Sequence, residues 1–217
     1  MLPRHHEHLP ERGEAARARL REVAGRARPV VTATDRLVRV PGPLGDALPG
    51  GGLRRGAVAT VDGVPGSGTT SVVLALAAAV TAAGEWAVVV DPDGTFGGRA
   101  AAEAGVVLER FAVVRRAPPE RWATVVAALL DGFALVAADV PPYCKLGDAR
   151  RLAARARERA ALFVVRGAWP AEAAVRLCTT TSQWSGLGDG EGLLARRDLQ
   201  VRVESRGAPV HARLRAG

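Results

Sequence analysis

Short apolar runs alternate along the chain with longer segments that carry an apolar stripe, which predicts strands and helices in turn. Runs such as Val88-Val89-Val90 are continuous, as expected for strands whose two faces are both covered. We expect strands near residues 57–62, 86–91, 111–115, 134–138 and 161–165. We expect helices near residues 69–83, 98–104, 119–131, 147–160 and 171–177. This order predicts an α/β fold, with a mostly parallel sheet and helices on both of its faces.

The N-terminal part of the chain, residues 1–40, departs from this alternation. Residues 1–10 are expected to be disordered, and residues 11–27 are expected to form an arginine-rich helix that ends before Pro29. A loop that extends to Leu53 is expected to lead into the first strand of the core.

The far end of the core, which we take as residues 41–217, has a different pattern. Apolar and polar residues alternate in 199–204 and in 209–214, on either side of Arg206-Gly207. Period-two alternation around a turn sequence predicts a β-hairpin, which we place at the edge of the sheet.

Charge is distributed unevenly along the 217 residues, whose net charge is +8. Residues 1–40 and 146–217 are both basic, whereas residues 41–145 carry a small acidic excess. Almost all of the basic residues are arginine, since Lys145 is the one lysine. Basic ends of this kind can contact nucleic acid or an acidic partner.

Several classes of protein are excluded by the same survey. The longest uncharged apolar run, residues 72–83, is too short to cross a bilayer, and no signal peptide is visible at the N-terminus. The two cysteines match no metal or redox spacing. We therefore expect a reduced, cytoplasmic protein with no membrane contact.

A glycine-rich segment follows the first core strand and leads into a helix. Strand, glycine loop and helix form the context of a phosphate-binding loop, in which backbone N–H groups and the helix dipole attract an anion. The candidate residues are Gly63, Gly66, Ser67, Gly68, Thr69 and Thr70. The pattern G-x-x-x-x-G-K-[ST] fails at the lysine, where Thr69 stands, and that lysine normally reaches the terminal phosphates.

Three interpretations of this loop remain open from the residues alone. The first interpretation is a working nucleotide site with another cation, and the second is a turn retained after nucleotide binding was lost. The third is a dinucleotide site with Asp91 as the ribose acceptor. Acidic residues at strand ends bear on this choice. Asp93 and Asp139 are candidate, vestigial catalytic residues, and Thr70 with Asp139 would hold Mg²⁺ if any is bound. The competing explanation is that Asp91-Pro92-Asp93-Gly94 is a turn.

Arginines and tryptophans in the C-terminal half are candidate contacts for a partner or for DNA. The set comprises Arg150, Arg151, Arg155 and Arg159 on one predicted helix, and Trp169 and Trp184 in predicted loops. Residues 151, 155 and 159 are spaced four apart, so they share a helix face. The alternatives are a solvated helix for the arginines and a core position for Trp184.

The order of motifs resembles the ATPase core of RecA-type recombinases. The resemblance begins at Leu44-Gly45-Asp46-Ala47-Leu48-Pro49-Gly50-Gly51-Gly52-Leu53-Arg54-Arg55-Gly56, continues through the loop and the Asp91 strand to Asp139, and covers roughly residues 44–140. Within that group, the chain resembles the short actinobacterial SOS-mutagenesis proteins called ImuA-prime. The shared features there include Arg121-Trp122-Ala123 and the segment from Trp184 to Gly190.

This resemblance implies a RecA-like fold without the ATPase. The loop lysine is Thr69, the catalytic glutamate falls on the shorter Asp93, and the phosphate-sensing amide has become Arg166 or Gly167. The DNA-binding loops have little room between Asp139 and the helix that begins near residue 147. These departures from the family pattern argue against an ATP-driven recombinase, so we expect no catalytic residue and no cofactor, with ATP and Mg²⁺ as the alternative.

The function implied is that of an adaptor in SOS-induced mutagenic translesion synthesis. The expected partners are an ImuB-type relative of the Y-family polymerases and a DnaE-type error-prone polymerase, with the sliding clamp reached indirectly. DNA contact is expected to be weak or indirect, in the cytoplasm near the nucleoid. The alternatives are a weak ATPase of the RecA superfamily and a regulator that binds single-stranded DNA.

Overall fold

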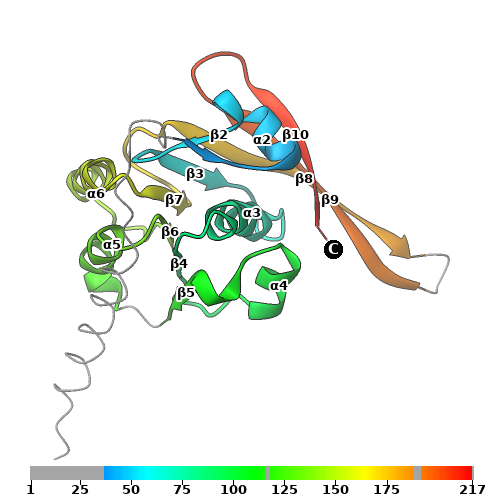
Figure 1. Ribbon diagram of the computed structural model, residues 1–217, viewed down its shortest axis with the longest axis horizontal. Coiled ribbons are helices and arrows are strands. Elements are labelled where there is room, and N and C mark those ends of the chain that lie inside the picture. The colour runs from blue at the N-terminus through cyan, green and yellow to red at the C-terminus, as the bar shows by residue number, and fades with distance from the viewer. Residues whose placement is uncertain (1–36, 116–117, 188–191, 217) are drawn as a thin grey trace, which may run out of the picture.

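Five short parallel strands form one side of the large sheet, out to its edge, in the computed structural model, which describes residues 37–115, 118–187 and 192–216 (Figure 1). They are β3 (Val58–Asp62), β4 (Ala87–Val90), β5 (Phe111–Val114), β6 (Leu135–Asp139) and β7 (Leu162–Arg166). Each agrees with a strand expected from the sequence to within one or two residues at its ends. The expected helix at 11–27 and the disorder expected for residues 1–10 lie outside the described residues.

Helices connect these strands, as expected. They are α3 (Thr69–Ala82), α4 (Gly98–Glu103), α5 (Trp122–Leu130) and α6 (Leu146–Arg159), with short 3₁₀ turns η2 (Leu108–Arg110) and η3 (Pro119–Arg121) before β5 and α5. None of the helices within the described ranges is long and apolar enough to cross a membrane.

Two hydrophobic cores lie on the two faces of the sheet, so the expectation of helices on both faces is confirmed. In Figure 1, α5 and α6 cover one face, and α3 and α4 cover the other. Alternate residues of one strand enter different cores. Val88 and Val136 pack with α5 and α6, whereas Val89 and Leu135 pack with α3.

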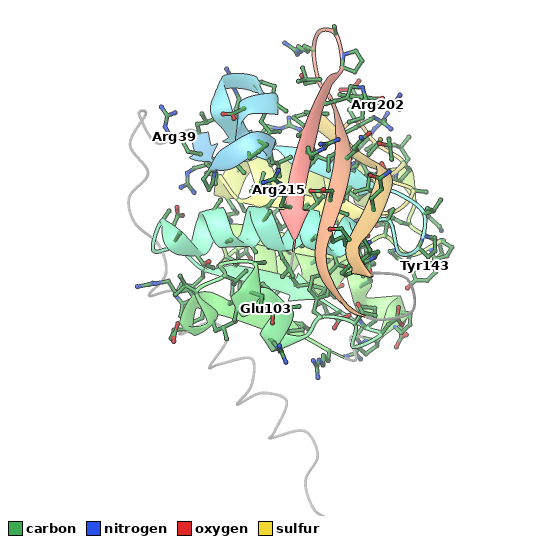
Figure 2. The ribbon with its side chains drawn as sticks, turned by 90° about the vertical axis from the view of Figure 1, so that its right-hand side faces the viewer. Arg39, Glu103, Tyr143, Arg202 and Arg215 are labelled. Carbon is green, nitrogen blue, oxygen red and sulfur yellow. The ribbon has the colours of Figure 1, made fainter. Side chains whose placement is uncertain are left out.

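Three strands extend the sheet beyond β3. They are β8 (Val175–Leu187), β9 (Gly192–Glu204) and β10 (Val210–Ala216), which give the strand order β10-β9-β8-β3-β7-β6-β4-β5. β8 pairs in parallel with β3, and β9 and β10 then follow in antiparallel pairing. The expected hairpin around Arg206-Gly207 is confirmed as β9 and β10. Figure 2, which faces these strands, shows them in front of α3, with Arg202 and Arg215 labelled.

The helix expected at 171–177 is wrong. Residues 175–177 belong to β8 and pair in parallel with β3, Ala59 opposite Val175 and Val61 opposite Leu177. Val175 and Leu177 are buried and Arg176 is exposed, which is the period of two that a strand requires. The segment is short enough for its apolar residues to fit either period, and pairing with β3 decides the outcome.

The loop expected before β3 contains regular structure. It comprises β1 (Leu37–Arg39), α2 (Gly42–Ala47), the 3₁₀ turn η1 (Pro49–Gly51) and β2 (Gly52–Arg54). β1 pairs with β2 in a separate two-stranded sheet. Val38, Leu44 and Leu53 are buried in the same core as α3, so this segment covers one end of that core.

Candidate functional site

The glycine loop lies at the carboxyl edge of the sheet, between β3 and α3. Gly66 and Gly68 have φ angles of 79° and 102°, which glycine adopts without strain. Gly68 is the N-cap of α3, and its carbonyl accepts the first helical hydrogen bond, from the Val72 N–H. The loop therefore leads directly into the N-terminus of a helix, as the sequence predicts.

The loop packs closely against the antiparallel strands. The hydroxyls of Ser67 and Thr179 are 2.5 Å apart and buried. Thr179 donates to the carbonyl of Asp62 at 3.2 Å, so Ser67 is the donor to Thr179. A side chain at Gly63 would place its Cβ 1.9 Å from Thr179 Oγ1, and one at Gly68 would come within 2.5 Å of Leu199. The glycines at both ends of the loop are thus required by packing against β8 and β9.

An arginine from β9 ties the exposed part of the loop to the hairpin. Arg197 donates to the Gly66 carbonyl and, at 2.7 Å, to Ser182 Oγ. Its guanidinium lies 5.1 Å from the centre of the Trp184 ring, a cation–π distance. Trp184 is 52% exposed and lies in β8, which corrects the expectation that it lies in a loop.

A second arginine connects Thr70 with Asp139, the two residues expected to hold Mg²⁺. Arg166 forms a two-point ion pair with the carboxylate of Asp139, its Nη2 atom lying 2.6 Å from Oδ2. Its Nη1 atom donates to Thr70 Oγ1 at 3.0 Å, and its guanidinium lies 4.9 Å from the centre of the Phe96 ring. The guanidinium of Arg166 thus contacts the side-chain oxygens of both residues that were expected to coordinate a metal.

The residues present therefore do not fit a divalent cation as they are arranged. In phosphate loops, the Thr hydroxyl and a strand-end Asp coordinate Mg²⁺, which requires oxygen ligands at about 2.0–2.1 Å. Here the N–H groups of Arg166 occupy those oxygens. Among the described residues, no group of three or more His, Cys, Asp or Glu side chains could hold a metal ion.

Asp91, the candidate ribose acceptor, has a structural role. Its carboxylate is buried and accepts the N–H groups of Thr95 and Phe96 and the hydroxyl of Thr95, at 2.9–3.0 Å. Burial acts to raise the pKa of Asp91, but these hydrogen bonds and the charge of Arg115 outweigh it, so the pKa lies below its ordinary value. Both oxygens are engaged within the protein, which argues against the dinucleotide interpretation.

Asp93, the other carboxylate of that turn, lies in an exposed position. The segment from Asp91 to Phe96 is therefore a turn built around Asp91, as the competing explanation held. Lys145, which the sequence places far from the loop, is exposed at the N-cap of α6.

The arginines expected to form a basic stripe on α6 are largely paired with carboxylates. Arg155 and Arg159 both contact Asp131, and Arg151 contacts Asp148. Arg150 is exposed. Burial acts to raise the pKa of Asp131, but the hydrogen bonds and charges of Arg155 and Arg159 lower it by more. The pKa of Asp131 therefore lies below its ordinary value.

A groove of about 520 Å³ lies between α5 and α6. It is lined by several of these residues and by Ala123, Ala127 and Leu152.

Trp169 is buried, which corrects its expected role as an exposed contact. It is 8% exposed and makes an edge-to-face contact with Phe163, with ring centres 5.5 Å apart. Its place is the core beneath α5 and α6. Between the two tryptophans, the exposed one is therefore Trp184.

Sequence reasoning missed three contributors to this edge of the sheet: Phe96, Thr179 and Arg197. The strand containing Thr179 was expected to begin as a helix, and the partner of Arg197 depends on the path of the hairpin. Arg166 was singled out, but as a lost sensor residue. Its position directly after the apolar run 162–165, next to a strand that ends in Asp139, is the signal that could have predicted the ion pair.

The chain is thus an α/β protein with a mixed, mostly parallel sheet, whose central strand runs through a glycine loop into a helix. A family model, the MT3502 N-terminal domain, matches residues 46–171, which is more than half of the chain. The protein therefore belongs to that family. The matched segment runs from α2 to just after β7 and includes the glycine loop, Asp139 and Arg166. A comparison with curated proteins gave no match.

Proposed function

We propose that this protein is a non-catalytic adaptor with a RecA-like fold that acts in SOS-induced mutagenic translesion synthesis. In this role it binds an ImuB-type polymerase relative and, with it, a DnaE-type polymerase, while the sliding clamp is reached indirectly. The proposal rests on the sequence resemblance, which runs through the glycine loop to Asp139, and on the chemistry of the loop.

The non-catalytic part of the proposal rests on the two places in the loop where a lysine and a metal ion would be needed, because residues of the protein itself stand there. Thr69 stands where the phosphate-binding lysine is needed, and Arg166 bridges Thr70 and Asp139. The Ser67 hydroxyl is bonded to Thr179. Phosphoryl transfer depends on charge stabilisation by a lysine and a metal ion, and these contacts leave neither in place. A fold maintained without that chemistry is suited to holding partners.

Exposed apolar side chains near the loop support the docking part. Val64 in the loop is 72% exposed, and Trp184 and Tyr143 are each 52% exposed. Val64 and Tyr143 follow the carboxyl ends of β3 and β6, so both lie at the edge of the sheet that carries the loop. Arg197 joins Trp184 to the same loop. Tryptophan and arginine are over-represented among the residues that dominate binding energy at interfaces.

Co-elution of the purified protein with its cognate ImuB-type protein tests the proposal. We expect a complex at micromolar concentrations, with and without ATP and MgCl₂. Trp184→Ala is expected to weaken it by about 30-fold or more, because truncating an interface hot spot costs about 2 kcal/mol or more. Leu108→Ala is the matched control, since Leu108 is a 43% exposed apolar residue in η2, at the amino end of β5 and away from the loop.

Separate elution of the two wild-type proteins would overturn the adaptor proposal. The same preparations distinguish the two alternatives. Magnesium-dependent release of phosphate from ATP that disappears in Asp139→Ala would favour the ATPase. Salt-sensitive retention on single-stranded DNA would favour the DNA-binding regulator.

A further inference from the structure

Arg166 has a set of contacts that a structural ion pair alone does not require. It is the last residue of β7, and its register partner in β6 is Asp139, the last residue of that strand. Beyond that pair, its third nitrogen reaches across to Thr70 in the first turn of α3. The ring of Phe96 covers the guanidinium, whose side chain is 16% exposed.

From these contacts we infer that Arg166 permanently occupies the position of the divalent cation, so that this loop is complete without metal. The inference rests on the interpretation of residues 63–70 as a phosphate-type loop, which is part of the proposed function, and it does not depend on any partner. It assigns Arg166 a role in place of a cofactor, where the resemblance had marked only a lost sensor.

Geometry favours the guanidinium at this position. The planar fork of arginine matches a carboxylate with two parallel hydrogen bonds and leaves further N–H groups for a third acceptor. Those acceptors are the two oxygens of Asp139 and the hydroxyl of Thr70. The strand pairing fixes Arg166 beside Asp139, so the side chain reaches both partners without a change of backbone.

Charge opposes the addition of a metal. The carboxylate of Asp139 is balanced by the guanidinium, and a divalent cation at the same oxygens would lie against a fixed positive charge. The guanidinium is part of the chain, so a chelator cannot remove it. The site is therefore expected to be insensitive to Mg²⁺ and to EDTA.

Removing Arg166 is expected to restore a response to metal, because it frees a carboxylate and a hydroxyl that are ligands of the type Mg²⁺ prefers. Thermal unfolding of the full chain tests this with three proteins: wild type, Arg166→Ala, and Arg166→Ala combined with Asp139→Asn. We expect the wild type to be unaffected by millimolar MgCl₂ or MnCl₂ at matched ionic strength. The single variant is expected to melt lower and to gain about 3 °C with either salt, and the double variant to gain nothing.

Arg155→Ala is a matched control, since Arg155 also forms a two-point pair with a carboxylate, that of Asp131. Arg159 remains on Asp131 in that variant, so no metal response is expected. A folded Arg166→Ala protein that ignores both metals, or one whose response survives Asp139→Asn, would overturn the inference.

A second measurement covers the case in which Arg166→Ala does not fold. The electron paramagnetic resonance signal of free Mn²⁺ is followed as wild-type protein is added. An unchanged signal supports a site that already holds its cation, whereas a loss of signal that Asp139→Asn abolishes overturns it. This readout uses the chain alone, so its failure is distinguishable from a failure to bind the ImuB-type partner.

Discussion

Two acidic residues end neighbouring buried strands at the same edge of the sheet, and their carboxylates are held in different ways. Asp91 follows β4 and is bound by backbone N–H groups and the hydroxyl of its own turn, four and five residues ahead. Asp139 ends β6 and is bound by Arg166, a side chain from the next strand. One carboxylate fixes a turn, and the other fixes the relation between two strands and the helix that contains Thr70.

The difference teaches that an acidic residue after an apolar strand is not by itself evidence of catalysis. In both cases the charge is satisfied within the protein, once by backbone dipoles and once by a cation. What distinguishes the two is the distance along the chain to the partner. The local arrangement is visible in the sequence Asp91-Pro92-Asp93-Gly94, whereas the other arrangement requires the strand order.

The largest effect is expected at Asp91. Asp91→Ala leaves the buried N–H of Phe96 and the N–H of Thr95 without their acceptor and is expected to lower the free energy of unfolding by about 3 kcal/mol. Urea unfolding followed by circular dichroism measures this loss. Asp93→Ala, in the same turn and exposed, is the control and is expected to change stability by less than about 0.5 kcal/mol. Equal effects of the two changes would contradict the structural role of Asp91.

A smaller loss is expected at Asp139. Asp139→Ala leaves the partly buried guanidinium of Arg166 without its counter-charge, which is expected to cost about 2 kcal/mol. A double-mutant cycle with Arg166→Met separates the pair from its surroundings. Because the double variant removes both charges, we expect it to be more stable than Asp139→Ala alone. Strict additivity of the two changes would show that the pair contributes nothing.

Acid should reveal the Asp91 contribution separately. Its pKa is lowered in the folded protein, so its stabilisation is fully present above the unfolded value of about 3.9 and is lost as the pH falls through the lower folded pKa. Unfolding measured from about pH 5 downward is expected to depend less on pH in Asp91→Asn than in the wild type. Asp93→Asn, in the same turn and exposed, is the matched control. An unchanged slope in Asp91→Asn would contradict the assignment.

The smallest effect is expected on the far side of the sheet, at Asp131. Its side chain is as exposed as that of Asp139, but its partners Arg155 and Arg159 are 40% and 38% exposed, against 16% for Arg166. Water and salt screen such pairs, so Asp131→Ala is expected to cost about 1 kcal/mol or less, and less still at high salt. A loss as large as that of Asp139→Ala would mean that the greater exposure of Arg155 and Arg159 does not weaken their pairing with Asp131.

The sequence was sufficient for the parallel half of the fold. Strands β3 to β7 are continuous apolar runs bounded by glycine or charge, and α3, with eight buried residues, has a length that only a helix explains. On the other side of β3, only the hairpin formed by β9 and β10 was predicted. Residues 171–177 were assigned to the wrong element because Val175 and Leu177 satisfy a strand only once β3 lies beside them.

The candidate site divides in the same way. The loop from Gly63 to Thr70 was placed correctly, since strand, glycines and helix are adjacent in sequence. The contacts that decide its chemistry come from residues about 70 to 131 positions away, namely Asp139, Arg166, Thr179 and Arg197. No local pattern encodes such distances. Trp169 and Trp184 illustrate the same limit, because the sequence predicts both in loops and only packing separates the buried ring from the exposed one.

The tight fit of the loop against β8 and β9 bears on how such chains are recognised in genomes. Gly63 and Gly68 leave no room for a side chain, because Thr179 and Leu199 lie against them. Natural selection can therefore maintain the spacing of these glycines for steric reasons alone, with Thr69 rather than a lysine as the first residue of α3. A motif search scores the glycines but does not evaluate the residues that they contact. A phosphate-loop signature of this kind therefore does not by itself indicate a bound nucleotide.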